Sequence, residues 1–158
     1  MDQLKKLVED AAYLQDEVEA LKYVINSVPY DEKPGGKHSI LEMVALIDHA
    51  QQNHFRLAIQ HILSGRREAA PDQEDFRKSF TSDQIEGKSV DRVLEKIIKH
   101  RAAIISMLDK VTPADLDRTV TIRGKDKNIH MLLEEMLQFE RTQLKQVAER
   151  VLAISDRK

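Results

Sequence analysis

The chain has 158 residues, a length that fits one domain with a core of its own. Its 25 lysines and arginines nearly balance its 27 aspartates and glutamates, and the formal net charge of -2 gives no general attraction to nucleic acid or to an anionic membrane. The absence of cysteine excludes disulfides, thiolate metal sites and thiol nucleophiles. No apolar run approaches the ~20 residues of a membrane span, and the N-terminus lacks the apolar region of a signal peptide. We therefore expect one domain over residues 1–158, in a cytoplasmic protein that binds neither nucleic acid nor membrane.

Two amphipathic helices are predicted in the first half of the chain. Apolar residues at three- and four-residue steps predict a helix from about residue 2 to residue 27. Proline and glycine in residues 30–37 then indicate a connecting loop. Ser39 and Glu42 form the pattern of a capping box, which predicts that a second helix begins here and extends to about Leu63.

The second half is predicted to contain two more long helices. Residues 66–88 lack a helical pattern, and we expect a long crossover there. Ser89 is the predicted cap of a third helix that ends near Leu108. Thr112 followed by Pro113 indicates a short helical turn, and residues 120–125 indicate an extended piece and a turn. Asn128 is the predicted cap of the fourth helix, which extends to about Ile154. Four long helices with these connections predict an all-α four-helix bundle.

Each of the four apolar faces has a polar residue near its midpoint, namely Gln15, Gln51, Arg101 and Glu140. If the helices are aligned by their centres, these side chains share one layer of the core. The simplest interpretation is a buried Arg101–Glu140 ion pair with glutamine hydrogen bonds, which sets the register of the helices. Two alternatives stay open. In the first, some of the four residues reach solvent. In the second, Arg101 binds a carboxylate or phosphate of a ligand, and Glu140 and His54 transfer protons.

Four segments of the chain carry a resemblance to a known family. They are Lys37 to Glu42, Ala45 to His49, Arg123 to Lys127, and Leu132 to Val147. On these segments and on the order of its elements, the chain resembles the DinB-like superfamily of bacterial four-helix bundles, which includes metal-dependent hydrolases and thiol transferases. The resemblance spans nearly the whole chain. It implies a DinB-like bundle with the long crossover between helices two and three, and it implies a homodimer.

The family is best known by three histidines that hold one divalent metal. One histidine follows the capping-box serine by seven residues, and the other two stand four residues apart on the last helix. In this chain the three positions fall on Leu46, Phe139 and Gln143, and none of these is a good metal ligand. The resemblance therefore predicts the fold together with a degenerate metal site, and we expect no metal or other cofactor and assign no catalytic residue.

The predicted function is that of a metal-free module that binds a small ligand or a partner. We expect its pocket where relatives hold metal, lined by Leu46, Phe139 and Gln143 and floored by Gln51, Arg101 and Glu140. Replacing three imidazoles by these side chains makes the site largely apolar, and it removes the metal-activated water.

An enzyme is the alternative, a hydrolase or thiol transferase of the kind that the resemblance implies. It would use a displaced metal site built from His130, Glu134 and His49, or it would use Glu140 as a metal-free general base. The second role competes with the predicted ion pair, because pairing with Arg101 holds the carboxylate ionised and engaged. A purely structural protein with no pocket is the third possibility.

Overall fold

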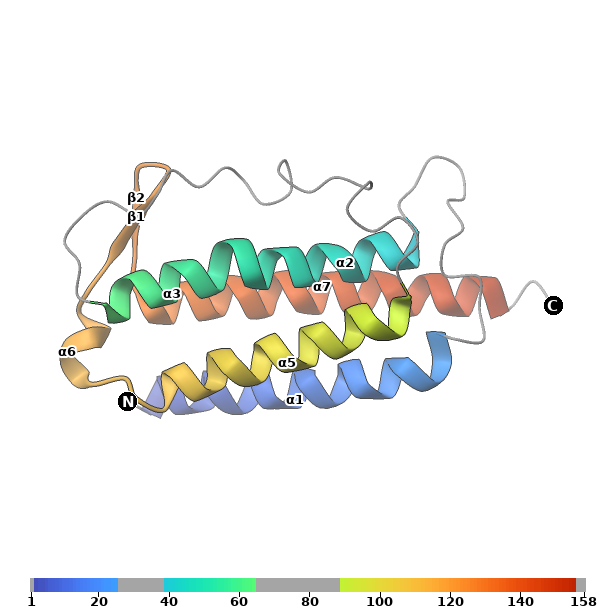
Figure 1. Cartoon of the computed structure of the whole chain (residues 1–158), viewed down its shortest axis with the longest axis horizontal. Helices are drawn as coiled ribbons and strands as arrows, with labels where there is room; N and C mark the ends of the chain where they lie inside the picture. The colour runs from blue at the N-terminus through green and yellow to red at the C-terminus, as the bar shows by residue number, and fades with distance from the viewer. Residues whose placement is uncertain (1, 26–38, 65–88, 156–158) are drawn as a thin grey trace.

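The computed structural model describes residues 2–25, 39–64 and 89–155, which form a bundle of four long helical columns (Figure 1). The predicted loop at 30–37 and the predicted crossover at 66–88 lie outside these residues. The elements are α1 (Asp2–Ile25), the continuous column of α2 (Ile40–Ala50), η2 (Gln51–Phe55) and α3 (Arg56–Leu63), then α5 (Val90–Leu108), α6 (Pro113–Leu116), β1 (Val120–Ile122), β2 (Lys125–Lys127) and α7 (Ile129–Ser155). None of the helices within these ranges is long and apolar enough to cross a lipid bilayer.

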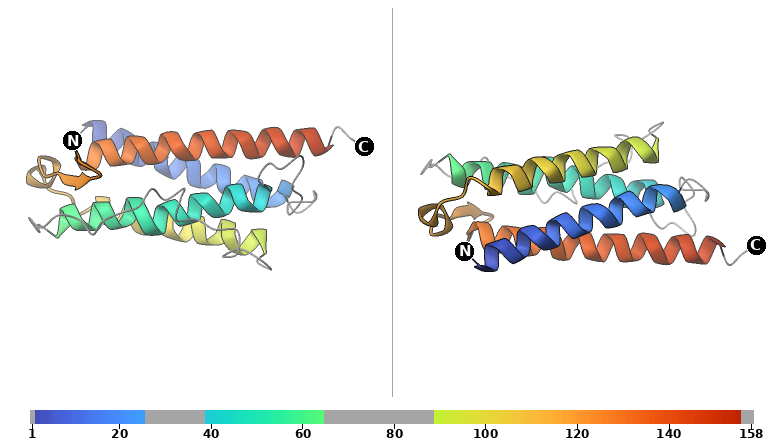
Figure 2. Two further views of the ribbon diagram at one scale, coloured as in Figure 1. Left: turned by 90° about the horizontal axis from the view of Figure 1, so that it is seen from above. Right: turned by 90° about the horizontal axis from the view of Figure 1, so that it is seen from below.

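The four columns form a square in cross-section. α1 packs against α5 and α7, and α2 packs against the same two helices, so α5 and α7 lie across the bundle from each other (Figure 2). α1 and α7 run in one direction, whereas the α2–α3 column and α5 run in the other (Figure 1). α3 therefore ends at the opposite end of the bundle from the start of α5, as a crossover between helices two and three requires. The predicted four-helix bundle is confirmed.

The apolar faces predicted from the periodicity meet along the bundle axis. Each column contributes side chains that are almost completely removed from water, among them Leu14, Ile47, Ile97 and Leu133. Burying one such side chain contributes about 1.5–3 kcal/mol, so the bundle is held together mainly by these faces. Buried polar side chains interrupt these faces near the centre of the bundle, and they are described below with the site.

Helix caps fix where the columns begin. At the start of α2, Glu42 N–H donates to Ser39 Oγ at 3.0 Å, and Ser39 N–H donates to Glu42 Oε1 at 3.1 Å, which confirms the predicted capping box. Met131 N–H donates to Asn128 Oδ1 at 2.8 Å, so Asn128 caps α7 as predicted. Ser89 occupies the predicted N-cap position of α5, but its side chain accepts no capping hydrogen bond. The predicted cap position is therefore confirmed, but the capping hydrogen bond is not formed. Ser89 is exposed, and at an exposed helix end water can bind the free amides.

The predicted extended piece near residue 120 is a two-stranded hairpin at the end of the bundle where α7 begins (Figure 1). β1 and β2 pair antiparallel, with Ile122 opposite Lys125. The two turn residues both have positive φ, 49° at Arg123 and 80° at Gly124, which is the conformation of a tight type I′ hairpin turn. The hairpin is therefore a defined structure that projects Arg123 and the two β2 lysines over the side of the bundle.

The second helix differs from the prediction at its centre. The sequence predicts one regular helix over residues 40–63, whereas the structure has a π-helical segment, η2, between α2 and α3. The amide of Arg56 donates to the carbonyl of Gln51, which closes the wider turn. A π turn has more residues per turn than an α turn. As a result, Gln51, His54 and Phe55 are all buried within one short segment.

Candidate functional site

A buried polar cluster lies at the centre of the bundle, made of the Ala11 carbonyl, Gln51, Arg101 and Glu140. Arg101 Nη2 forms an ion pair with Glu140 Oε2, and Gln51 Nε2 donates to Glu140 Oε1 at 2.8 Å. Arg101 Nη1 donates to the carbonyl oxygen of Ala11 at 2.8 Å. Gln51, Arg101 and Glu140 are 0%, 1% and 2% exposed, so the predicted buried ion pair with a glutamine hydrogen bond is confirmed.

Every column contributes to this cluster, but α1 does so through its backbone. Gln15 was predicted to complete the layer, yet it is only partly buried, and within the described residues no hydrogen bond joins it to the cluster. The carbonyl of Ala11, one turn earlier, takes its place. A backbone carbonyl has no sequence signature, which explains why the residue pattern pointed to the glutamine instead.

The buried polar cluster is expected to add little to the free energy of folding. Removal from water lowers the pKa of Arg101 to about 10, which still leaves the guanidinium protonated at neutral pH. Within the part of the chain that the structure describes, Gln51 Oε1 and Arg101 Nε find no hydrogen-bond partner. A buried ion pair of this kind gains little over well-packed apolar residues, whereas removing one partner alone is costly. That the pair sets the register of the helices stays a prediction, which its contacts across the four columns make physically reasonable.

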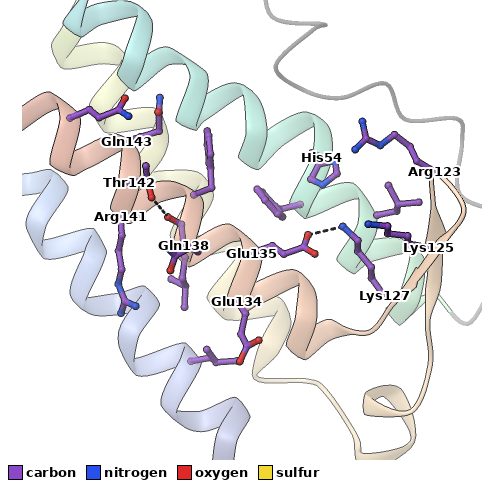
Figure 3. A pocket seen from close by; sticks show the side chains of 16 residues that line it. His54, Arg123, Lys125, Lys127, Glu134, Glu135, Gln138, Arg141, Thr142 and Gln143 are labelled. Atoms are coloured by element: carbon purple, nitrogen blue, oxygen red, sulfur yellow. Dashed lines mark hydrogen bonds and ion pairs between the residues drawn. The ribbon is translucent and has the colours of Figure 1, made fainter.

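A groove of about 1000 Å³ runs along the side of α7 near the hairpin (Figure 3). Its walls come from η2, from the hairpin, from α7 and from Leu7 of α1, so it extends over both sides of α7. Phe139 and Gln143, two of the positions predicted to line a pocket, are among its lining residues, as is His54. Gln143 Nε2 also donates to the carbonyl of Met43 at 3.3 Å, which ties this part of α7 to α2. Three of the lining residues are thus positions that the sequence singled out, and the others are not.

The six predicted pocket residues separate into three sets. Phe139 and Gln143 line the groove, and the three polar residues Gln51, Arg101 and Glu140 lie in the core, outside its lining. Leu46 is partly buried, packs against the core and is not part of the groove wall. The structure therefore brings together the three polar residues, as predicted, whereas ligand binding by any of the six stays a prediction.

Sequence reasoning missed the cationic side of the groove. Arg123, Lys125 and Lys127 line it from the hairpin, and Lys127 Nζ lies 2.8 Å from Glu135 Oε2 of α7 (Figure 3). Three cations within five residues at a glycine turn were the available signal. We call these three residues the hairpin cations.

Two other charged residues of the groove wall point elsewhere. Glu134 and Arg141 extend from the opposite side of α7 toward α1 (Figure 3). Arg141 Nη2 lies 3.6 Å from Asp10 Oδ2 on α1, which agrees with that direction. Their charges are therefore directed away from the hairpin cations.

The chemistry of the donor atoms does not fit the metal that the resemblance implies. Of Leu46, Phe139 and Gln143, only the glutamine has a side-chain atom that could bind a metal, and that amide is a weak ligand. His130 Nε2 lies 2.9 Å from Glu134 Oε1, so these two residues share a helix face as predicted. Across the described ranges, however, no three histidine, aspartate or glutamate side chains are grouped to hold a metal ion, so His49 does not complete that pair. Partial burial lowers the pKa of His49 despite the opposing charge of Asp48, and its ring contacts Asn53 at 3.1 Å.

Comparison with known proteins agrees with this architecture. Residues 4–147 match the family model described as the DinB superfamily. The fold is similar to that of YfiT from Bacillus subtilis, described as a probable metal-dependent hydrolase with an unusual four-helix bundle topology. The TM-score is 0.79 at 12% sequence identity, and the match covers 94% of this chain and 86% of that chain. At that identity the likeness shows the fold alone. No curated protein sequence matches the chain significantly.

Proposed function

The chain belongs to the DinB superfamily, and from this premise we propose that it is a metal-free member that binds a small ligand in the groove beside α7. The observation that carries the proposal is the joint placement of Phe139 and Gln143. Both occupy positions where the family pattern has metal-binding histidines, and both line the groove. The whole groove, on both sides of α7, has a volume at the upper end of the range of small-molecule sites, about 300–1000 Å³. The chain would thus keep the family's binding place and replace metal coordination by packing and hydrogen bonding.

The first experiment is a metal-binding test on protein purified without a polyhistidine tag. We expect less than about 0.1 equivalent of metal by mass spectrometry, and no shift of the melting temperature on adding nickel, zinc or manganese, because binding to the native state would raise it by mass action. Near-stoichiometric metal that is lost in His130→Ala but kept in His61→Ala would overturn the proposal. His61 is a suitable control because it lies on α3, outside the groove lining.

The second experiment asks whether the groove accepts small molecules. Amide chemical shifts of Phe139 and Gln143 should move during titration with small aromatic compounds, whereas those of Tyr13, which is 64% exposed on α1, should not. If no compound moves the groove amides at millimolar concentration, the structural role without a pocket is the better interpretation.

The enzyme alternative, a hydrolase or thiol transferase, receives less support from the placement of Glu140. That carboxylate is 2% exposed and held by Arg101 and Gln51, so it does not face a ligand in the groove. His54 lines the groove and is the residue on which a metal-free hydrolase would depend. Hydrolysis of a panel of activated esters and amides that disappears in His54→Ala would favour the enzyme.

The proposed homodimer and cytoplasmic location rest on the resemblance and on composition. Sedimentation equilibrium at micromolar concentration tests the first directly. A strictly monomeric species across the concentration range would contradict it.

A further inference from the structure

We infer that the groove selects an anion, a carboxylate or a phosphate joined to a short apolar or aromatic group, and that Lys125 and Lys127 of the hairpin hold the charged head. This inference deepens the proposed function and rests on it. It replaces the earlier alternative in which Arg101 binds the anion, because Arg101 is 1% exposed and already engaged by Glu140 and the Ala11 carbonyl.

The charge balance on the hairpin side of the groove is the first argument. Lys125 and Lys127 line this side, and the only carboxylate that lines it from the described residues is Glu135 (Figure 3). Arg123 also lines the groove, but the inferred binding of the head rests on the two lysines. Glu134, the other carboxylate of the wall, points to the far side of α7 (Figure 3). The local field therefore favours an anion although the whole chain has a net charge of -2.

The backbone of the hairpin explains how the cations are gathered. Successive side chains of a strand point to opposite faces, so Lys125 and Lys127 share one face of β2 while Asp126 takes the other. Asp126 Oδ1 accepts a hydrogen bond from Thr121 Oγ1 at 2.6 Å, and Asp126 is not part of the groove lining. The paired strands and the tight turn hold this arrangement before a ligand arrives, which lowers the entropy lost on binding.

The floor of the groove supplies the apolar contact. Phe55, Ile122 and Phe139 line the groove although they are only 2%, 5% and 9% exposed, so they lie at its base. The rings of His54 and Phe55 form a T-shaped pair, with centroids 4.7 Å apart and planes at 85°. A ligand that places a ring or short chain on this floor can reach the hairpin cations with its head.

Glu135 competes with the anionic head of a ligand for Lys127. It lies 2.8 Å from Lys127 Nζ, and the two side chains are 42% and 16% exposed. A bound anion must share Lys127 with Glu135 or displace it. Removing the charge of Glu135 should therefore strengthen anion binding, whereas a purely structural ion pair would give no such gain.

The test compares phenylacetate, phenyl phosphate, 2-phenylethanol and phenethylamine, which share an aromatic group and differ in the head. Dissociation constants come from amide shifts of Phe139 and Gln143. We expect the two anions to bind at least fivefold more tightly than the alcohol, and the amine to bind least. The tighter of the two anions identifies the head as carboxylate or phosphate. Raising the salt concentration should weaken the anions and leave the alcohol unchanged.

Matched variants then locate the head. Lys125→Met and Lys127→Met should each weaken phenylacetate binding about two- to fivefold, and Glu135→Gln should strengthen it about twofold, the scale of exposed ion pairs. Lys145→Met is the control, because Lys145 is exposed on α7 and outside this groove. None of the substituted side chains is part of the buried core. An unchanged amide spectrum away from the groove verifies the fold of each variant.

The outcomes separate the two proposals. If the alcohol binds the groove as tightly as the anions, or if Glu135→Gln does not strengthen the anions, the anion preference is wrong while small-ligand binding stands. If none of the four compounds moves the groove amides, the proposed function itself fails.

Discussion

Replacing Arg101 by alanine should destabilise the protein strongly, because it leaves Glu140 charged and unpaired in the core. Glu140 is 2% exposed, so water cannot replace the lost guanidinium without opening the bundle. Stripping one partner from a buried ion pair costs about 3–5 kcal/mol. Domains of this size are stable by about 5–15 kcal/mol, so the variant loses a large share of its stability.

Urea unfolding followed by circular dichroism at 222 nm measures this loss. The free energy of unfolding of a domain of this size falls by about 2 kcal/mol for each molar increase in urea, so the urea concentration at the midpoint should fall by about 2 M. The triple variant R101M/Q51M/E140M is the control, because it removes all three polar side chains together and leaves none unpaired; we expect its stability to lie within about 2 kcal/mol of the original or above it. If Arg101→Ala changes the free energy of unfolding by only a few tenths of a kcal/mol, burial of the pair is refuted.

Three further predictions concern the caps, the turn and the short helix α6. Ser39→Ala should cost about 1 kcal/mol in thermal unfolding, whereas Ser89→Ala should cost much less, since only Ser39 accepts a capping hydrogen bond; equal losses would contradict this reasoning. Gly124→Ala should cost about 1 kcal/mol, through backbone strain alone, because φ is +80° and no atom lies within 4 Å of an added Cβ; an unchanged melting temperature would show that the turn tolerates the residue. Hydrogen bonds from the Thr112 backbone and side chain lower the pKa of Asp115, so its contribution to stability is present above the ordinary carboxyl pKa and is lost as pH falls through the lowered value. Thr112→Val keeps the backbone donor and removes the hydroxyl. Carbon-detected NMR titration of Asp115 should therefore show that pKa rising part of the way toward its ordinary value, and no change would exclude the Thr112 hydroxyl as a cause.

Much of the bundle could be predicted from spacing alone. Apolar periodicity identifies the faces that are buried, and a capping box such as that of Ser39 and Glu42 identifies where a helix begins, because both signals are local. The Arg101–Glu140 pair was also predictable, because a charge in the middle of an apolar face needs a partner. Each of these two residues lies near the midpoint of the apolar face of its helix, and their charges are opposite.

The remaining features depend on tertiary structure. The π turn at Gln51 leaves no local signature, because its residues would also suit an α-helix. The hairpin cations were visible as a charged turn, but their place in the same groove as Phe139 depends on how the hairpin packs on the bundle. For the same reason, the groove was expected over the polar residues, whereas its wall comes partly from the hairpin.

The hydrogen bonds of the buried polar cluster have a consequence for chain synthesis. They join Ala11 to Arg101 and Gln51 to Glu140, which are 90 and 89 residues apart. Contacts of such long sequence separation form slowly, because a long loop must close before they contribute. A nascent chain that has not yet extended past Glu140 holds Arg101 and Gln51 with no carboxylate to pair with. A tight, dry core is then unfavourable, so the cluster delays full compaction until the last helix is made and leaves incomplete chains open to proteolysis.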